Sequence, residues 1–340
     1  MKNRLSMIGV AAALAVSLFA RTSAAQGIDT QCPPGATNAA GDPDNTKIAQ
    51  DACQKAIDLF KYLGPQLGAV VAGGSPTQGT SGTLGGPGHF SVGLRANGLR
   101  GSLPQIDRVV PNTRGAQLST YGIDDKPIGY VTADVAVGLF KGLQGSGLGS
   151  IDALISASYL PTYHNVNVDI TEPSGSLKFG FGAKVGLLTE SPVRPGIAVS
   201  YLDRGLPTVT ITGKSGNDRL ILADLSVRSR SWRLVAGKSF LFLGASAGFG
   251  QDSYDSEANI TVQIAPRQAT QGGTGGPIAL SQKLTRNNIF GSAWLNLRLF
   301  RLVGEAGRVT GGSIPTYNQF DGVQAADART YASLGISIGR

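Results

Sequence analysis

From residue 89 to its C-terminus, the sequence alternates between apolar residues and glycine, serine or polar residues with a period of two. This period is typical of β-strands, in which successive side chains point to opposite faces of a sheet. The pattern is clearest over 177–187, where Leu, Phe, Ala and Val alternate with Gly and Lys. A helix cannot produce this alternation, so the sequence predicts an all-β region over 89–340.

The two faces of these strands differ in chemistry. A soluble β-sandwich carries Lys, Glu and Thr on its outer face, whereas the non-apolar face here is mostly Gly and Ser with few charges. We therefore expect the apolar face to contact lipid. No segment after the N-terminal apolar run approaches the roughly 20 apolar residues that a membrane-spanning helix needs, which leaves a closed antiparallel up-and-down transmembrane β-barrel.

The alternating segments predict about ten strands. They lie near 89–98, 128–140, 150–160, 176–188, 195–203, 221–237, 240–250, 285–299, 301–311 and 329–340. Short and long connections alternate between them, and outer-membrane barrels have short periplasmic turns and long outer loops. Segments 209–213 and 258–264 are interpreted as hairpin extensions beyond the membrane; if they span it instead, the count rises to about 12–14.

The N-terminal part of the chain divides into two segments. Residues 1–25 have the features of a secretory signal peptide, because Lys2 and Arg4 precede an apolar run over 7–20 and small residues precede Gln26. Residues 26–88 form a helical and Gly-rich segment, interpreted as a hatch or a periplasmic segment. Within it, the spacing predicts a helix over 44–63 that stops at Gly64-Pro65.

Both cysteines of the chain, Cys32 and Cys53, lie in this N-terminal segment. An exported protein enters an oxidising compartment, so we expect a Cys32–Cys53 disulfide, which on the chain-entropy model contributes about 3 kcal/mol.

Composition and motifs exclude several functions. The formal charge of +8 falls to +5 without the signal peptide, because Lys2, Arg4 and Arg21 leave with it, and the remaining basic residues form no dense run. We therefore predict no nucleic-acid partner. The Gly-x-Ser-x-Gly match at 244–248 continues as a strand rather than forming a nucleophile elbow, and His89 and His164 are the only histidines. We predict no catalytic residue, metal site or cofactor, and no enzymatic activity.

The inward face predicts a lumen lined by small residues with scattered charges. A lumen rich in glycine has room for a filler, and the adjacent helix is the available one. Alternatively, the glycines ease strand coiling and larger residues fill the lumen. The candidate lumen residues are Asp134, Asp152, Lys178, Lys184, Phe290, Trp294, Asn296 and Arg298. Because these charges are of both signs, a strongly ion-selective pore is not predicted.

The Gly-rich alternating strands, the helix before them and the closing Ser-Leu-Gly-Ile-Ser-Ile-Gly-Arg resemble porin-like Gram-negative outer-membrane β-barrels, over about three quarters of the chain. The resemblance implies an outer-membrane location, with outer-membrane lipid and the barrel-assembly machinery as partners. The helical hatch is similar in arrangement to that of the long-chain fatty-acid transporter family. The chain departs from the class at Arg340, where an aromatic residue is usual.

These features predict passive transport of a small-molecule or lipid-like solute, with the N-terminal segment as plug. In the alternative, the barrel is structural or adhesive and acts through its outer loops. The first alternative predicts that the plug lies at least partly in the periplasmic end of the lumen.

Overall fold

The computed structural model describes residues 27–32, 45–75, 81–105, 111–143, 148–164, 168–266 and 273–339. The predicted signal peptide and Arg340 lie outside this range. Within these segments, no helix is long and apolar enough to cross a membrane.

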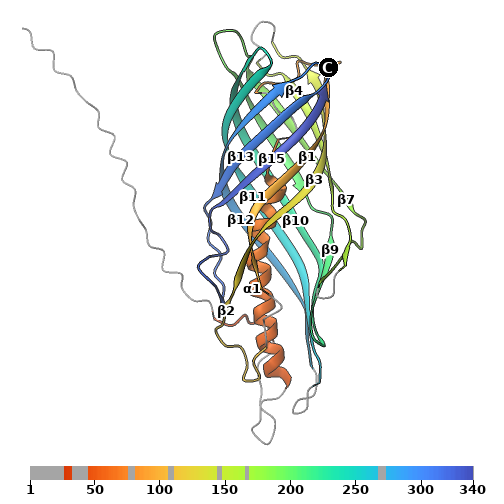
Figure 1. Cartoon of the computed structure of the whole chain (residues 1–340), viewed down its shortest axis with the longest axis vertical. Helices are drawn as coiled ribbons and strands as arrows, with labels where there is room; N and C mark the ends of the chain where they lie inside the picture. The colour runs from red at the N-terminus through yellow and green to blue at the C-terminus, as the bar shows by residue number, and fades with distance from the viewer. Residues whose placement is uncertain are drawn as a thin grey trace, which may run out of the picture.

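The chain forms an antiparallel up-and-down β-barrel (Figure 1). The ring follows the order β1 (Phe90–Pro104), β3 (Ile123–Phe140), β4 (Ile151–Tyr159), β7 (Leu177–Leu188), β8 (Gly196–Gly205), β10 (Asp218–Phe240), β11 (Leu243–Ile264), β12 (Gly273–Asn296), β13 (Arg301–Thr310) and β15 (Arg329–Gly339). Pairing of β15 with β1 and of β10 with β11 closes it. The predicted count of about ten strands is confirmed by this ring.

One end of the barrel carries short turns and the other carries long loops, and we call these the short-turn end and the long-loop end. Strands β10, β11 and β12 have 23, 22 and 24 residues, about twice the 9–11 that cross a bilayer. Their excess length projects from the long-loop end, where β9 (Val209–Ser215), β6 (Val168–Thr171) and β5 (Tyr163–His164) extend the same sheet. Segments 209–213 and 258–264 therefore lie in this projection.

A second, two-stranded sheet lies in the long loops. Its strands, β2 (Thr120–Tyr121) and β14 (Gln319–Phe320), pair in parallel although 199 residues separate Ser119 from its hydrogen-bond partner Asn318. The loop between β1 and β3 is thus joined to the loop between β13 and β15.

The apolar face of the ring points outward. Its members form an exposed belt, which includes Phe90, Val92, Leu94, Val131, Phe179, Phe181, Phe249, Ile289, Leu334 and Ile336. Residues of the opposite parity are buried, and many of them are serine or charged. For example, Arg95 is buried while its neighbour Leu94 is exposed, and Asp134 is buried while Val131 is exposed. A soluble protein has the opposite arrangement. This polar interior and apolar exterior are the arrangement of a transmembrane barrel.

Placing a charge on this belt should destabilise the barrel strongly. Phe181 on β7 is 61% exposed and faces outward in the middle of its strand. We expect Phe181→Arg to lower the free energy of unfolding in lipid vesicles by about 2–4 kcal/mol, because the guanidinium would lie in the hydrocarbon. Phe181→Leu, which keeps an apolar surface, is the control. Equal stability of the two variants would mean that this face does not contact lipid.

Helix α1 (Asn45–Ala72) is longer than the predicted 44–63, and the predicted stop at Gly64-Pro65 is wrong. A proline inside a helix leaves the carbonyl four residues earlier without its N–H donor. Here that carbonyl is Lys61 O, and the side-chain amide of Gln282 on β12 donates to it at 3.1 Å. The barrel wall therefore supplies the hydrogen bond that Pro65 removes, and the helix continues.

Helix α1 runs inside the barrel (Figure 1). It contacts β1, β3, β8, β10, β11, β12 and β15, which lie on all sides of the ring. Gly64 and Gly68 let the helix approach β11 closely: a Cβ at Gly68 would lie 2.4 Å from the ring of Tyr254. The helix begins at the long-loop end and finishes within the ring, and the chain then continues to β1 at the short-turn end.

Candidate functional site

Three buried arginines surround the C-terminus of α1 in the lumen. Arg95 from β1, Arg204 from β8 and Arg233 from β10 converge there from three different strands. Arg204 donates to the carbonyls of Ala72, Gly73 and Gly74, Arg95 to Gly73 O and Arg233 to Ala72 O. We call Arg95, Arg204 and Arg233 the arginine latch.

The latch fits the electrostatics of a helix end. The last carbonyls of a helix have no partner within the helix and carry partial negative charge, which nearby cations stabilise. Tyr130 completes the set by donating its hydroxyl to Val71 O at 3.1 Å. A helix end buried in a barrel needs such partners, and here strand side chains provide them for the carbonyls of Val71 and Ala72.

Two carboxylates balance part of the latch charge. Asp134 accepts two hydrogen bonds from Arg95, at 2.8 and 3.1 Å, and Glu305 accepts one from Arg233 at 3.1 Å. Tyr331 also donates to Glu305 at 3.1 Å. Arg204 bonds to helix carbonyls instead, so its charge is matched mainly by the helix end.

The inward face of the ring strands carries more positive than negative charge, before the charges of α1 are counted. The buried charged residues of the described ring strands that face inward, apart from the strand tip at Asp218, are Arg95, Lys184, Arg204, Arg233, Arg286, Arg329, Asp134, Asp152, Asp252 and Glu305. Six are basic and four are acidic. The expectation of mixed signs is met, but these residues leave an excess of two positive charges.

Within the part of the chain that the structure describes, several polar atoms in this region have no hydrogen-bond partner. They include Nε of Arg204 and Arg233, and the hydroxyls of Ser156, Ser229 and Ser231. Unsatisfied buried polar groups are expensive in a dry protein interior, so their presence favours a lumen that holds water.

The sequence-predicted lumen residues occupy different environments. Asp134, Asp152, Lys184, Phe290 and Trp294 are buried inside the ring, and Asn296 is half-buried at the end of β12. Lys178 and Arg298 are exposed, so the structure does not place them in the enclosed part of the lumen. Lys178 lies at the long-loop rim of β7, and Arg298 lies in the turn after β12, beyond the strand where parity fixes direction.

Sequence reasoning missed the arginine latch. Arg95 and Arg233 stand at inward parity in alternating strands, which was the available signal for a charged lumen. Their convergence on one helix end depends on the shear of the barrel and on how deep the helix sits, and neither can be read from spacing.

Residues 81–89 line the short-turn end of the lumen, and we call them the strap. Leu84 N donates to both carboxylate oxygens of Asp152, at 2.9 and 3.1 Å, and the Thr83 and Ser150 hydroxyls lie 2.6 Å apart. Gly86 packs on Gly138, where a Cβ would lie 2.3 Å from Gly86 O. A cavity of about 410 Å³ opens between the strap and the β12–β13 turn.

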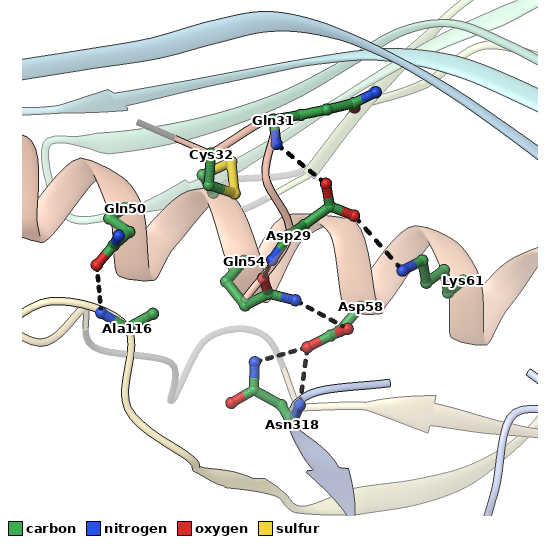
Figure 2. Close-up of a disulfide and its surroundings, with 10 residues drawn as sticks. Asp29, Gln31, Cys32, Gln50, Gln54, Asp58, Lys61, Ala116 and Asn318 are labelled. Atoms are coloured by element: carbon green, nitrogen blue, oxygen red, sulfur yellow. Dashed lines mark hydrogen bonds and ion pairs between the residues drawn. A yellow bond between two sulfur atoms is a disulfide. The ribbon is translucent and has the colours of Figure 1, made fainter. Parts of the chain in front are cut away.

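At the opposite end, the predicted disulfide is present. Cys32 and Cys53 are joined with an S–S distance of 2.03 Å (Figure 2). Asp29 N donates to Gln54 at 2.6 Å, and the Asp29 carboxylate lies 3.7 Å from Lys61 Nζ. Residues 27–32 are thus bound to the helix face at the long-loop end.

The long loops dock on the same part of the helix. Asp58 accepts hydrogen bonds from the backbone N–H and the side chain of Asn318, both at 2.8 Å (Figure 2). It also accepts one from the backbone N–H of Tyr317 at 3.1 Å. Burial raises the pKa of Asp58, and these hydrogen bonds partly oppose the shift. Asp51 likewise accepts from Asn112 N and Gln117 N.

Three stacked rings join both loops to the helix. Phe320 lies between Tyr62 and Tyr121, with ring centroids 4.0 and 5.1 Å apart. The long-loop end of the lumen is therefore closed by the helix, the loops and the disulfide. The N-terminal segment fills this end as well as the middle of the ring, whereas an entry from the periplasmic end was expected; only the strap lies at the short-turn end.

Removing the disulfide should loosen the N-terminal segment and leave the barrel folded. We expect the Cys32→Ser, Cys53→Ser variant to have a segment that is less stable by about 3 kcal/mol, because the disulfide no longer constrains the loop between these positions. Limited proteolysis should then cut near α1, while the heat-modifiable mobility of the barrel on gels is unchanged. Loss of that mobility would show that the disulfide supports the barrel itself.

The described residues contain no group of three His, Cys, Asp or Glu side chains placed to hold a metal ion. The Gly-x-Ser-x-Gly segment at 244–248 lies within β11, as its alternation predicts.

The closed ring, the apolar belt and the polar lumen define a β-barrel of the outer-membrane type. No protein-family model matches the chain, and no curated protein matches it. Among solved structures, it is similar to the outer membrane protease OmpT of Escherichia coli, with 12% identity over 78% of this chain and 100% of that one and a TM-score of 0.33.

Two further similarities are with the attachment invasion locus protein Ail of Yersinia pestis and an anion-selective porin from Comamonas acidovorans. They have 8% identity each, over 75% and 74% of this chain and 99% and 98% of the other, with TM-scores of 0.26 and 0.18. Similarities of this size do not distinguish a porin, an adhesin and a protease, so function is argued from the lumen.

Proposed function

We propose that the protein is an outer-membrane barrel for passive transport of small solutes, with α1 as a plug held by the arginine latch. The supporting observation is that a helix fills a lumen whose walls are polar and, among the described residues, include several atoms without hydrogen-bond partners. A barrel whose role is only structural could bury apolar residues there at lower energetic cost. Once the helix moves, a water-filled path through the barrel needs polar walls of this kind.

The latch also suits a reversible contact. It consists of hydrogen bonds from wall arginines to helix carbonyls, and water can replace both partners when the helix leaves. A cavity of about 410 Å³ lies beside the strap at the short-turn end. The solute would be small or amphipathic, as the sequence predicts.

The alternative is a structural or adhesive barrel that acts through its outer loops. The closure of the long-loop end favours it, because the stack of Tyr62, Phe320 and Tyr121 and the disulfide hold the loops and helix as one unit. In this alternative the lumen never opens, so the two proposals differ in permeability.

A reversible lock on the plug tests the proposal. A Cβ at Gly64 would lie 3.4 Å from Ser256 Cβ on β11, close to the separation in disulfides. In a Cys32→Ser, Cys53→Ser background, Gly64→Cys with Ser256→Cys should form a bond between helix and wall. We expect proteoliposomes with the oxidised protein to exclude a small sugar and those with the reduced protein to admit it.

The background without the two new cysteines is the matched control, and its permeability should not respond to reductant. If oxidised, reduced and control proteins all exclude the sugar, the plug does not gate a path and the structural alternative is favoured.

A further inference from the structure

The N-terminal end of α1 lies at the long-loop end of the barrel, opposite to the end where β1 begins. The chain therefore passes through the lumen before the first strand: residues 27–32 are at one mouth, α1 and the latch are in the ring, and the strap is at the other mouth. From this path we infer a second function, presentation of the protein's own N-terminal segment at the cell surface.

The contacts of residues 27–32 fix their position. Cys32 is bonded to Cys53, and Asp29 contacts Gln54 and Lys61. The disulfide packs with Ile57 and with Ile278 of β12. Ile278 is 18 residues from Asn296, where β12 ends at the short turns, so this cluster belongs to the projecting part of the strand.

The side of the membrane follows from the loops. Long loops of outer-membrane barrels face the exterior, and this assignment is part of the proposed outer-membrane role. Gly27 is exposed, and nothing lies within 4 Å of a Cβ built on it. A side chain introduced at Gly27 would therefore meet no neighbouring atom and be open to the medium at the long-loop end.

Single-cysteine labelling tests the placement. Both native cysteines are in the disulfide, so one introduced cysteine is the only free thiol. The probe is a membrane-impermeant maleimide applied to intact cells. The test variant is Gly27→Cys, and Ile28→Cys, at a neighbouring site that is 40% exposed, repeats it.

Two control positions identify the two sides of the membrane. Asn217 lies in the exposed β9–β10 turn at the long-loop end, and Val193, 93% exposed, lies in the β7–β8 turn at the short-turn end. We expect Gly27→Cys and Asn217→Cys to label in intact cells, and Val193→Cys to label only after permeabilisation. Heat-modifiable mobility verifies that each variant is folded.

Labelling of Asn217→Cys but not of Gly27→Cys or Ile28→Cys in intact cells would overturn the inference, because the N-terminal segment would then lie on the periplasmic side. Labelling of Val193→Cys alone would overturn it too, because the barrel would be inverted. Neither outcome depends on whether solute passes, so the transport proposal is tested separately by the locked plug.

Discussion

Deletion of residues 27–75 is expected to convert a closed barrel into an open channel. The deletion removes α1 and the contacts of the latch while keeping the strap and every strand. Single-channel conductance in a planar bilayer should rise at least about tenfold, because the helix and its side chains occupy a cylinder about 10–12 Å wide. Loss of the helix also exposes the latch arginines to water.

The open channel should favour anions. The lumen keeps six buried basic and four acidic residues, and the helix end that faced the latch is gone. A reversal potential measured across a salt gradient should have the sign of anion selectivity. The control is full-length protein, folded and inserted in the same way. A truncated barrel that retains heat-modifiable mobility but conducts no more than the full chain would contradict the plug.

Replacing Arg95 by methionine should destabilise the protein by about 3–5 kcal/mol, because it leaves the fully buried Asp134 carboxylate without its cation. The same change removes the donor to Gly73 O at the helix end. We therefore expect unfolding in urea, monitored in lipid vesicles, at lower denaturant concentration. We also expect brief channel openings in the folded variant.

Arg228→Met is the matched control. Arg228 forms an ion pair with Asp203 on the outer surface, where both residues are in contact with solvent. Such pairs contribute about 0–1 kcal/mol, so this variant should be nearly as stable as the parent and should remain closed. An equal loss of stability in the two variants would mean that the buried Arg95–Asp134 pair contributes no more than the exposed Arg228–Asp203 pair.

Much of the barrel could be read from the chain because membrane strands follow a local rule. A residue on a transmembrane strand faces either the lipid or the lumen. The parity of the strand alone therefore predicts that Phe179 and Phe181 face outward and that Lys184 faces inward. The connection lengths similarly predicted the two ends, because turn length is a local property. The disulfide was predictable since the chain offers one pair of cysteines.

The interior was harder to predict, because its partners are distant in sequence. Pro65 stops a helix by the local rule, yet α1 continues because Gln282, 221 residues away from Lys61, supplies the lost hydrogen bond. Lys178 has the parity of the inward-facing residues, but it is exposed because it lies at the rim of the barrel. Arg298 is exposed because it lies in the turn after β12.

The sequence by itself determined the closed barrel with its apolar outer face, since a period of two and the absence of long apolar runs after the N-terminal segment leave no other way to satisfy a backbone in a bilayer. Only the tertiary structure decided that the N-terminal helix enters from the long-loop end and that Arg95, Arg204 and Arg233 meet at its C-terminus. The depth and direction of a helix in a lumen depend on close packing, such as Gly68 on Tyr254, and on charges from separate strands. These contacts exist only once the ring has closed.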